Sequence, residues 1–273
     1  MKVFIFLFSL MLTVNLYGQI NWVTDYNIAR AKCKQSGKLM VIDFWADWCN
    51  PCKSMDKELW NTSQFSEQDF IALKVDVDRD KATPERFDIS GLPTVIIAMS
   101  DGTVLWEKSG FSDAESFLKV LRSIPADVSN LYRCYYDINA MGKNSKCAFD
   151  IAVEFQRLAA LTPDPELRSR LSEKNTEFFK KAIKYNTAPE LNQDAELFLL
   201  LNEIYSSKPE KVLHKFNKNF GSAEKCMNKD LAHFLLANCY FVMDDDEKFS
   251  SEIAMVSDKA LLEQWAFLCN ENK

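Results

Sequence analysis

Residues 41–53 of this 273-residue chain read Val-Ile-Asp-Phe-Trp-Ala-Asp-Trp-Cys-Asn-Pro-Cys-Lys. The first half belongs to an apolar run interrupted only by Asp43, which is typical of a strand covered on both faces. The second half contains Cys49 and Cys52 in a Cys-x-x-Cys motif. Pro51 fits the first turn of a helix, because no backbone N–H is needed there. The stretch therefore predicts a buried strand followed by a helix that begins near Cys49.

The residues on both sides of this stretch alternate between helix and strand patterns. Gly37 should end the first helix, and Asp101-Gly102 should form a hairpin turn. We expect helices over 24–36, from Cys49, and over 117–123, and strands over 39–45, 70–76, 94–99 and 103–106. This order predicts an α/β fold in which a mixed sheet lies between helices.

From Pro125 onward the sequence predicts only helices. The apolar spacing indicates helices near 127–141, 145–161, 164–186, 190–206, 209–220, 228–243 and 247–270. The breaks are short, so we expect helical hairpins, with an α/β domain over 19–124 and an all-helical domain over 125–273. Tyr205 and Tyr240 lie 35 residues apart, close to the 34-residue tetratricopeptide period. A repeat array and a plain helical bundle both stay open.

A Cys-x-x-Cys motif serves either zinc binding or redox chemistry. Zinc requires further ligands, but the chain has no second such motif, and its two histidines, His214 and His233, lie in the helical half. We therefore expect no metal site. At a helix N-terminus the Cys49 thiol should ionise readily and attack, while Cys52, one turn inside, should resolve the mixed disulfide.

Residues 41–53, together with Ile-Ser-Gly-Leu-Pro-Thr at 89–94, resemble the thioredoxin family over about 22–124. The resemblance implies a thioredoxin fold and an enzyme that exchanges protein thiols and disulfides, with no cofactor beyond the Cys49–Cys52 disulfide. It also implies that Asp43 is a buried acid that takes the proton of the second cysteine. Burial should raise the pKa of this carboxyl.

The same resemblance suggests roles for further residues. Lys74 matches a lysine near the buried acid, although a surface lysine beside the sheet is an equal alternative. Pro93 should be cis, with backbone groups beside it that pair with an extended substrate. The family usually has Gly at the position of Asn50, so Asn50 can tune the redox potential. The expected substrate-binding residues are Trp48, Asn50, Pro51, Leu92, Pro93 and Thr94.

Residues 53–66 resemble exported thioredoxin-like domains related to the carboxy-terminal domain of the disulfide-interchange membrane electron carrier. This implies a reductase or electron relay rather than an oxidase. It would act on protein disulfides and would itself be reduced again by an upstream thiol donor. The helical domain would select a partner or form a homodimer. The alternative is a binding adaptor whose redox activity is secondary.

Residues 1–18 have the pattern of a secretory signal peptide. Lys2 precedes an apolar run from Val3 to Val14, and the small Gly18 stands at the expected cleavage point. The run is shorter than the roughly 20 residues of a membrane span. We expect an exported protein, in the periplasm by family resemblance, with no membrane association after cleavage. A net charge of −6 without a basic block argues against nucleic-acid binding.

Six cysteines lie outside the motif: Cys33, Cys134, Cys147, Cys226, Cys239 and Cys269. Cys33 should belong to the core of the first helix. Cys134 and Cys147 are 13 residues apart, as are Cys226 and Cys239. On a simple hairpin turning near Gly142, Cys134 and Cys147 would sit at different heights, several ångströms apart. Disulfides in these pairings are therefore possible but not favoured over buried thiols.

Overall fold

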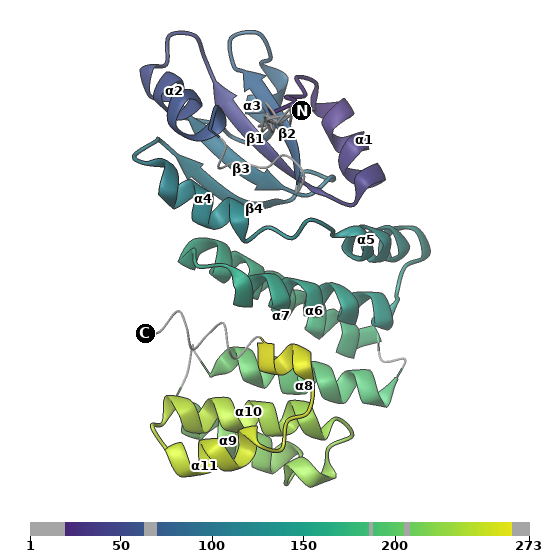
Figure 1. The fold of residues 1–273 in the computed structure, drawn as a ribbon. Helices are drawn as coiled ribbons and strands as arrows, with labels where there is room; N and C mark the ends of the chain where they lie inside the picture. The colour runs from purple at the N-terminus through teal and green to yellow at the C-terminus, as the bar shows by residue number, and fades with distance from the viewer. Residues whose placement is uncertain (1–19, 63–69, 186–187, 205–207, 264–273) are drawn as a thin grey trace, which may run out of the picture.

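The computed structural model describes residues 20–62, 70–185, 188–204 and 208–263 of the chain (Figure 1). The expected signal peptide over residues 1–18 and the position of Cys269 lie outside these ranges. Among the described residues, no helix combines the length and the apolar character needed to cross a membrane.

The first half of the chain forms a four-stranded sheet with helices on both sides. Its order is β2-β1-β3-β4; β1 and β2 are parallel and the other neighbours antiparallel. The elements are α1 Tyr26–Ser36, β1 Leu39–Trp45, α2 Asn50–Met55, the π-turn η1 Asp56–Trp60, β2 Phe70–Asp76, α3 Ala82–Arg86, β3 Thr94–Ala98, β4 Val104–Ser109 and α4 Ala114–Arg122. The predicted mixed sheet between helices is confirmed.

Local sequence signals set the two ends of α1. Asp25 accepts a hydrogen bond from the Ile28 N–H at the start of α1, and Gly37 ends the helix with a left-handed φ of 67°. The strands β1 and β2 begin and end at the residues predicted. The short helix α3 was not predicted, and β4 runs to Ser109, three residues beyond its predicted end.

The two faces of β1 enter different hydrophobic clusters. Met40, Ile42 and Phe44 pack with residues of α1, among them the fully buried Cys33. Leu39 and Val41 face the opposite side, where η1 and α4 contribute their apolar side chains. Asp43 follows the same alternation as Leu39 and Val41, so it enters the side of the sheet that α2 and η1 cover.

The second half is helical, as predicted, and its neighbouring helices pack in chain order from α5 to α9 (Figure 1). The elements are α5 Ser129–Met141, α6 Ser145–Leu161, α7 Pro165–Tyr185, α8 Pro189–Glu203, α9 Pro209–Asn219, the 3-10 turn η2 Ala223–Lys225, α10 Lys229–Val242 and α11 Asp246–Ile253. A tetratricopeptide arrangement stays a prediction, since Tyr205 lies outside the described residues.

The connection between the halves runs against the base of the sheet, where β1 begins. The Val128 N–H donates to the Gly37 carbonyl at 2.6 Å. The Tyr132 hydroxyl donates to the Lys38 carbonyl at 2.8 Å and accepts from the Ser100 N–H at 3.2 Å. One hydrophobic cluster continues from the sheet into the helices. The division of the chain into two domains at Pro125 stays a prediction.

The predicted helix over 247–270 is wrong in its middle. The helix α11 ends at Ile253, and the chain leaves helical conformation before a new turn begins at residue 259. The break depends on a residue of α10: Asp230 Oδ2 accepts from Ser257 N and Oγ, both at 2.8 Å, and from Asp258 N at 2.6 Å. Asp258 in turn caps the next turn through the Ala260 N–H. Residues 264–270 lie outside the described ranges.

The predicted height difference between Cys134 and Cys147 stays a prediction; Cys147 Sγ lies 3.6 Å from Asp137 Oδ2, one helical turn after Cys134. Gly142 ends α5 with a φ of 80°, and Asn144, which caps α6, is extended. Both cysteines are buried and reduced, as are Cys33, Cys226 and Cys239.

Candidate active site

The cysteine pair occupies the start of α2, immediately after β1 and a short loop. Cys49 is the N-cap residue of α2, and Cys52 lies in its first turn. The two form a disulfide with a Cα–Cα distance of 5.3 Å, and the Cys52 N–H donates to Cys49 Sγ at 3.2 Å. Pro51 is in the first turn, as predicted, and is exposed together with Asn50. A thiolate at Cys49 would face the positive end of the helix dipole.

Both cysteines are largely covered: Cys49 is 4% exposed and Cys52 1%. Ala46 shares their small apolar cluster, and Leu92 packs against it. The order of burial agrees with an attacking Cys49 and a resolving Cys52. The difference in exposed fraction between the two cysteines is small. The assignment of Cys49 as the attacking cysteine therefore depends mainly on its position at the helix end.

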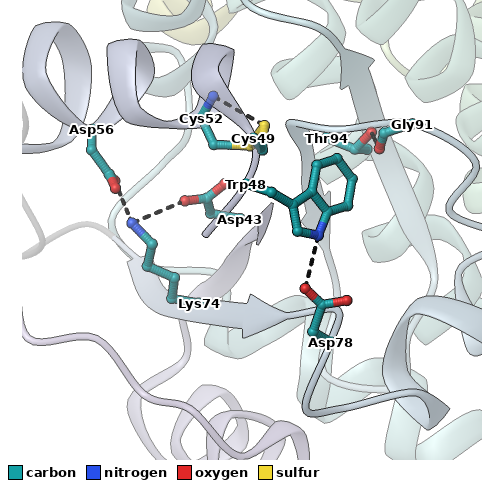
Figure 2. Close-up of a disulfide and its surroundings, with 9 residues drawn as sticks. All are labelled: Asp43, Trp48, Cys49, Cys52, Asp56, Lys74, Asp78, Gly91 and Thr94. Atoms are coloured by element: carbon teal, nitrogen blue, oxygen red, sulfur yellow. Dashed lines mark hydrogen bonds and ion pairs between the residues drawn. A yellow bond between two sulfur atoms is a disulfide. The ribbon is translucent and has the colours of Figure 1, made fainter. Parts of the chain in front are cut away.

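Asp43 supplies a buried carboxyl beneath the pair, and Figure 2 draws it between Lys74 and the two cysteines. It is 1% exposed. Burial raises the pKa of this carboxyl to about 7, and the nearby Lys74 ammonium and Asp56 carboxylate act in opposite directions on it. A carboxyl that titrates near neutral pH can both accept and return a proton at working pH.

Lys74 is placed beside Asp43 by the parallel register of β1 and β2, in which the two residues are direct partners. Its Nζ lies 3.4 Å from Asp43 Oδ2. The ammonium of this lysine lies over two indole rings, with the ring centroids of Trp22 and Trp45 at 5.3 and 5.0 Å from Nζ. The predicted proximity of Lys74 to the buried acid is therefore present, and its side chain is only 15% exposed.

The sequence interpretation missed Asp56. This carboxylate forms a short ion pair with Lys74 Nζ (Figure 2). Its negative charge raises the pKa of Asp43 by repulsion, and both carboxylates pair with the same ammonium. A signal was available, because Asp56 follows Cys52 by four residues and lies one helical turn further along the same face. The pairing itself depends on β2, which delivers Lys74.

Trp48 lies beside the pair and is 66% exposed, an unusual position for a large apolar ring. Its Nε1–H donates to Asp78 Oδ2 at 2.8 Å (Figure 2). Asp78 follows β2 and was not singled out from the sequence. The hydrogen bond orients the indole next to Cys49.

The loop before β3 completes the site. The Leu92–Pro93 peptide bond is cis, as predicted. Thr94 is buried; its hydroxyl donates to the Gly91 carbonyl at 2.9 Å and lies 2.7 Å from Ser109 Oγ. The Pro93 carbonyl accepts from the Gly110 N–H at 2.7 Å, which ties the loop to the end of β4.

No metal centre competes with this site in the described part of the chain, where no three His, Cys, Asp or Glu side chains group as ligands. His214 is exposed. His233 is mostly buried, and its Nδ1 lies 2.6 Å from Glu252 Oε2.

The chemistry available here is a cycle between a disulfide and two thiols. The helix end favours a thiolate at Cys49, the second thiol lies one turn away, and a carboxyl of near-neutral pKa stands ready for its proton. A protein that works in this way is a thiol–disulfide oxidoreductase, and its redox-active disulfide takes the place of a cofactor.

Comparison with known proteins gives the family. A family model described as Thioredoxin matches residues 22–123. Thioredoxin of Staphylococcus aureus (strain Mu50 / ATCC 700699) is 32% identical over 88 residues, which are 32% of this chain and 84% of that protein. Thioredoxin of Buchnera aphidicola is 33% identical over 63 residues, 23% of this chain and 58% of its own. The chain belongs to the thioredoxin family.

A solved structure also resembles the chain. It is the oxidised C-terminal domain of DsbD from Neisseria meningitidis, at 23% identity and a TM-score of 0.33. The match covers 38% of this chain and 98% of that domain.

Proposed function

We propose that this protein is an exported reductase or electron relay that acts on protein disulfides through Cys49 and Cys52. The observation that carries the proposal is Asp43, a carboxyl 1% exposed behind the cysteine pair, whose pKa burial raises to about 7. Burying an ionised carboxylate costs free energy of folding. The expected role of Asp43 explains its presence here, because the buried Cys52 thiol needs a group that accepts its proton.

The proposed reaction begins with reduced protein. The Cys49 thiolate attacks one sulfur of a substrate disulfide, forming a mixed disulfide and releasing the first substrate sulfur as a thiolate. Cys52 then passes its proton to the Asp43 carboxylate, and its sulfur attacks Cys49 Sγ. The second substrate thiolate leaves, and Cys49 and Cys52 are joined again. Two electrons pass to the substrate, and an upstream thiol donor restores the dithiol.

Charge around the pair supports reduction over oxidation. A strong disulfide oxidant owes its power to a stabilised reduced form. Here the Asp56 carboxylate and, when it is ionised, the Asp43 carboxylate lie near the pair, and among the described residues Lys74 forms an ion pair with each of them. Negative charge disfavours the thiolate form, which makes the reduced pair a better electron donor. The resemblance of residues 53–66 to exported relay domains agrees with this direction.

Three features would position a protein substrate. The exposed ring of Trp48 offers apolar contact beside Cys49. Asn50 and Pro51 are exposed on the helix end. The Pro93 carbonyl already accepts a hydrogen bond from the Gly110 N–H. The backbone of Leu92 would therefore form the hydrogen bonds to an extended substrate.

Export to the periplasm is supported by the sequence of residues 1–18, with their basic start, apolar middle and small residue at the end. The test is expression of the full gene in a Gram-negative bacterium, followed by fractionation and mass measurement. Export predicts a periplasmic chain that begins at Gln19. A cytosolic chain that keeps Met1 would refute it.

The helical half would select the partner, and a second copy of this chain is one candidate. Its exposed apolar side chains include Phe241, Val242 and Met243 at the end of α10, and Met255 after α11. Light scattering at several protein concentrations tests the dimer. A monomer at all of them would remove the homodimer and leave a different partner.

The activity test couples dithiothreitol to reduction of a protein disulfide such as insulin. We expect turnover by the parent, none by Cys49→Ser, and parental turnover by Cys33→Ser, which removes a buried thiol far from the site. Activity retained by Cys49→Ser would refute the assignment. Cys52→Ser should trap the mixed disulfide and so identify substrates.

The direction of transfer is tested by the redox potential. Equilibration with glutathione should give a potential nearer to about −270 mV, as in thioredoxin, than to about −120 mV, as in a strong periplasmic oxidant. A value near the second figure would contradict the reductase.

A further inference from the structure

A second pair of thiols lies in the helical half, between α5 and α6. Cys134 is fully buried in the middle of α5, and Cys147 is 5% exposed in the first turn of α6. Asn144 caps α6 by accepting from the Cys147 N–H at 2.9 Å, which fixes the position of this residue.

The two thiols influence each other. Burial, together with the Cys147 side chain, raises the pKa of the Cys134 thiol. Cys147 Sγ also lies 3.6 Å from Asp137 Oδ2, a carboxylate one turn after Cys134. Cys147 therefore faces α5 beside Asp137, and Cys134 lies one turn away on the same side of that helix.

We propose that Cys134 and Cys147 form a second disulfide, which fastens α5 to α6. Each thiol loses one hydrogen, the two sulfurs join, and a disulfide of another molecule takes up two electrons and two protons to become two thiols. The bond closes a short loop between adjacent helices, so it restricts the unfolded chain more than it alters the folded one.

The oxidant must be a separate molecule, such as a small disulfide or the disulfide of another protein. α5 contacts the base of the sheet through Tyr132 and Lys38, whereas Cys49 follows the opposite end of β1. Seven residues of extended strand span about 20 Å, which puts the two cysteine pairs out of reach within one chain. The new disulfide is therefore separate from the catalytic cycle.

The position of the bond suggests what it does. α5 is the helix that hydrogen-bonds to the base of the sheet, and Tyr135 packs against Phe155 of α6 and Phe178 of α7. A covalent link from α5 to α6 would fasten the helix that contacts the sheet to the rest of the helical half. Its persistence in the cell rests on the proposed export, because an oxidising compartment preserves disulfides.

The test uses the full chain carrying Cys49→Ser and Cys52→Ser, so that the active site neither gives nor takes electrons. The protein is reduced, unfolded and refolded in a mixture of reduced and oxidised glutathione, so burial does not limit access. Free thiols are alkylated in denaturant, and the peptides are mapped by mass spectrometry. We expect Cys134 linked to Cys147, with Cys226 and Cys239 alkylated.

Cys226 and Cys239 are matched controls, because they have the same spacing in sequence and are also buried. Burial alone raises the pKa of Cys239, and burial with the Asp194 carboxylate raises that of Cys226. Alkylated Cys134 and Cys147, or a link from either to another cysteine, would overturn the proposal.

A second measurement does not depend on mapping. In the same background, oxidation should raise the midpoint of chemical unfolding. The rise should vanish in Cys134→Ser and persist in Cys226→Ser. Because each variant is compared with itself in oxidising and reducing buffer, the cost of a buried serine cancels. The proposal of a stabilising disulfide would be refuted if the unfolding midpoint of the parent protein were the same in oxidising and reducing buffer.

Discussion

Replacing Asp43 with asparagine should make the folded chain more stable above neutral pH. The carboxyl of Asp43 has its pKa raised from 3.8 to about 7, chiefly by burial. The folded protein therefore holds a proton that the unfolded chain releases between about pH 4 and pH 7. Stability is full below this window and is lost as the pH rises through 7.

The magnitude follows from the size of the shift. A rise of about three pKa units corresponds to about 4 kcal/mol, at 1.36 kcal/mol per unit. Asparagine has a similar shape and no charge, so Asp43→Asn should gain up to about 4 kcal/mol near pH 8. This is an upper bound, because Lys74 loses one of its two carboxylate partners.

The assay is urea unfolding followed by circular dichroism at about pH 5 and about pH 8, values on the two sides of the raised pKa. The parent should lose stability between them, and Asp43→Asn should lose less. Asp47→Asn removes the same charge from an exposed position in the same segment and should behave as the parent. If Asp43→Asn keeps the pH dependence of the parent, the buried carboxyl is not protonated in the fold.

Further predictions concern one residue each. Asp56→Asn should free Lys74 for Asp43 and lower the pKa of that carboxyl, so the midpoint of the pH–rate profile should move to lower pH. Trp48→Ala should raise KM for a protein disulfide by about tenfold, and leave a small disulfide unaffected, because an exposed ring contributes only to large interfaces. Tyr132→Phe should destabilise the fold by about 1–3 kcal/mol in urea unfolding, since the buried Ser100 N–H loses its acceptor.

Each of these variants has a partner that separates the effect from general damage. Asp56→Glu keeps the charge and should retain the parental pH profile. Met227→Ala removes an apolar side chain of similar exposure in the helical half, and should leave KM unchanged. Tyr136→Phe changes an exposed tyrosine on the same helix and should cost little. A parental KM for Trp48→Ala would remove the indole from substrate binding.

The sequence predicted the centre of the fold well because its signals are local. β1 and β2 are nearly continuous apolar runs, and their ends were predicted to the residue. Helix α3 was not predicted from the sequence, because five residues with one buried side chain carry no periodic pattern. The end of α11 escaped because the break depends on Asp230, which lies 27 residues away from Ser257.

The same distinction applies to the site. Asp43, Cys49 and Cys52 stand within ten residues of one another, so one stretch of sequence displayed all three. The ion pair between Asp56 and Lys74 joins α2 and η1 to β2, and the Trp48 partner Asp78 comes from the loop after β2. Such pairs exist only after the strands align, so no spacing along the chain reveals them.

The helical half packs against the end of the sheet where β1 begins, whereas the cysteine pair follows the end of β1 (Figure 1). A carrier protein bound to α9, α10 and α11 would therefore leave the active site free. If that protein also held the substrate, the substrate disulfide could be reduced without release of the bound protein. The disulfide would then meet Cys49 repeatedly at a high effective concentration, rather than by diffusion from bulk solution.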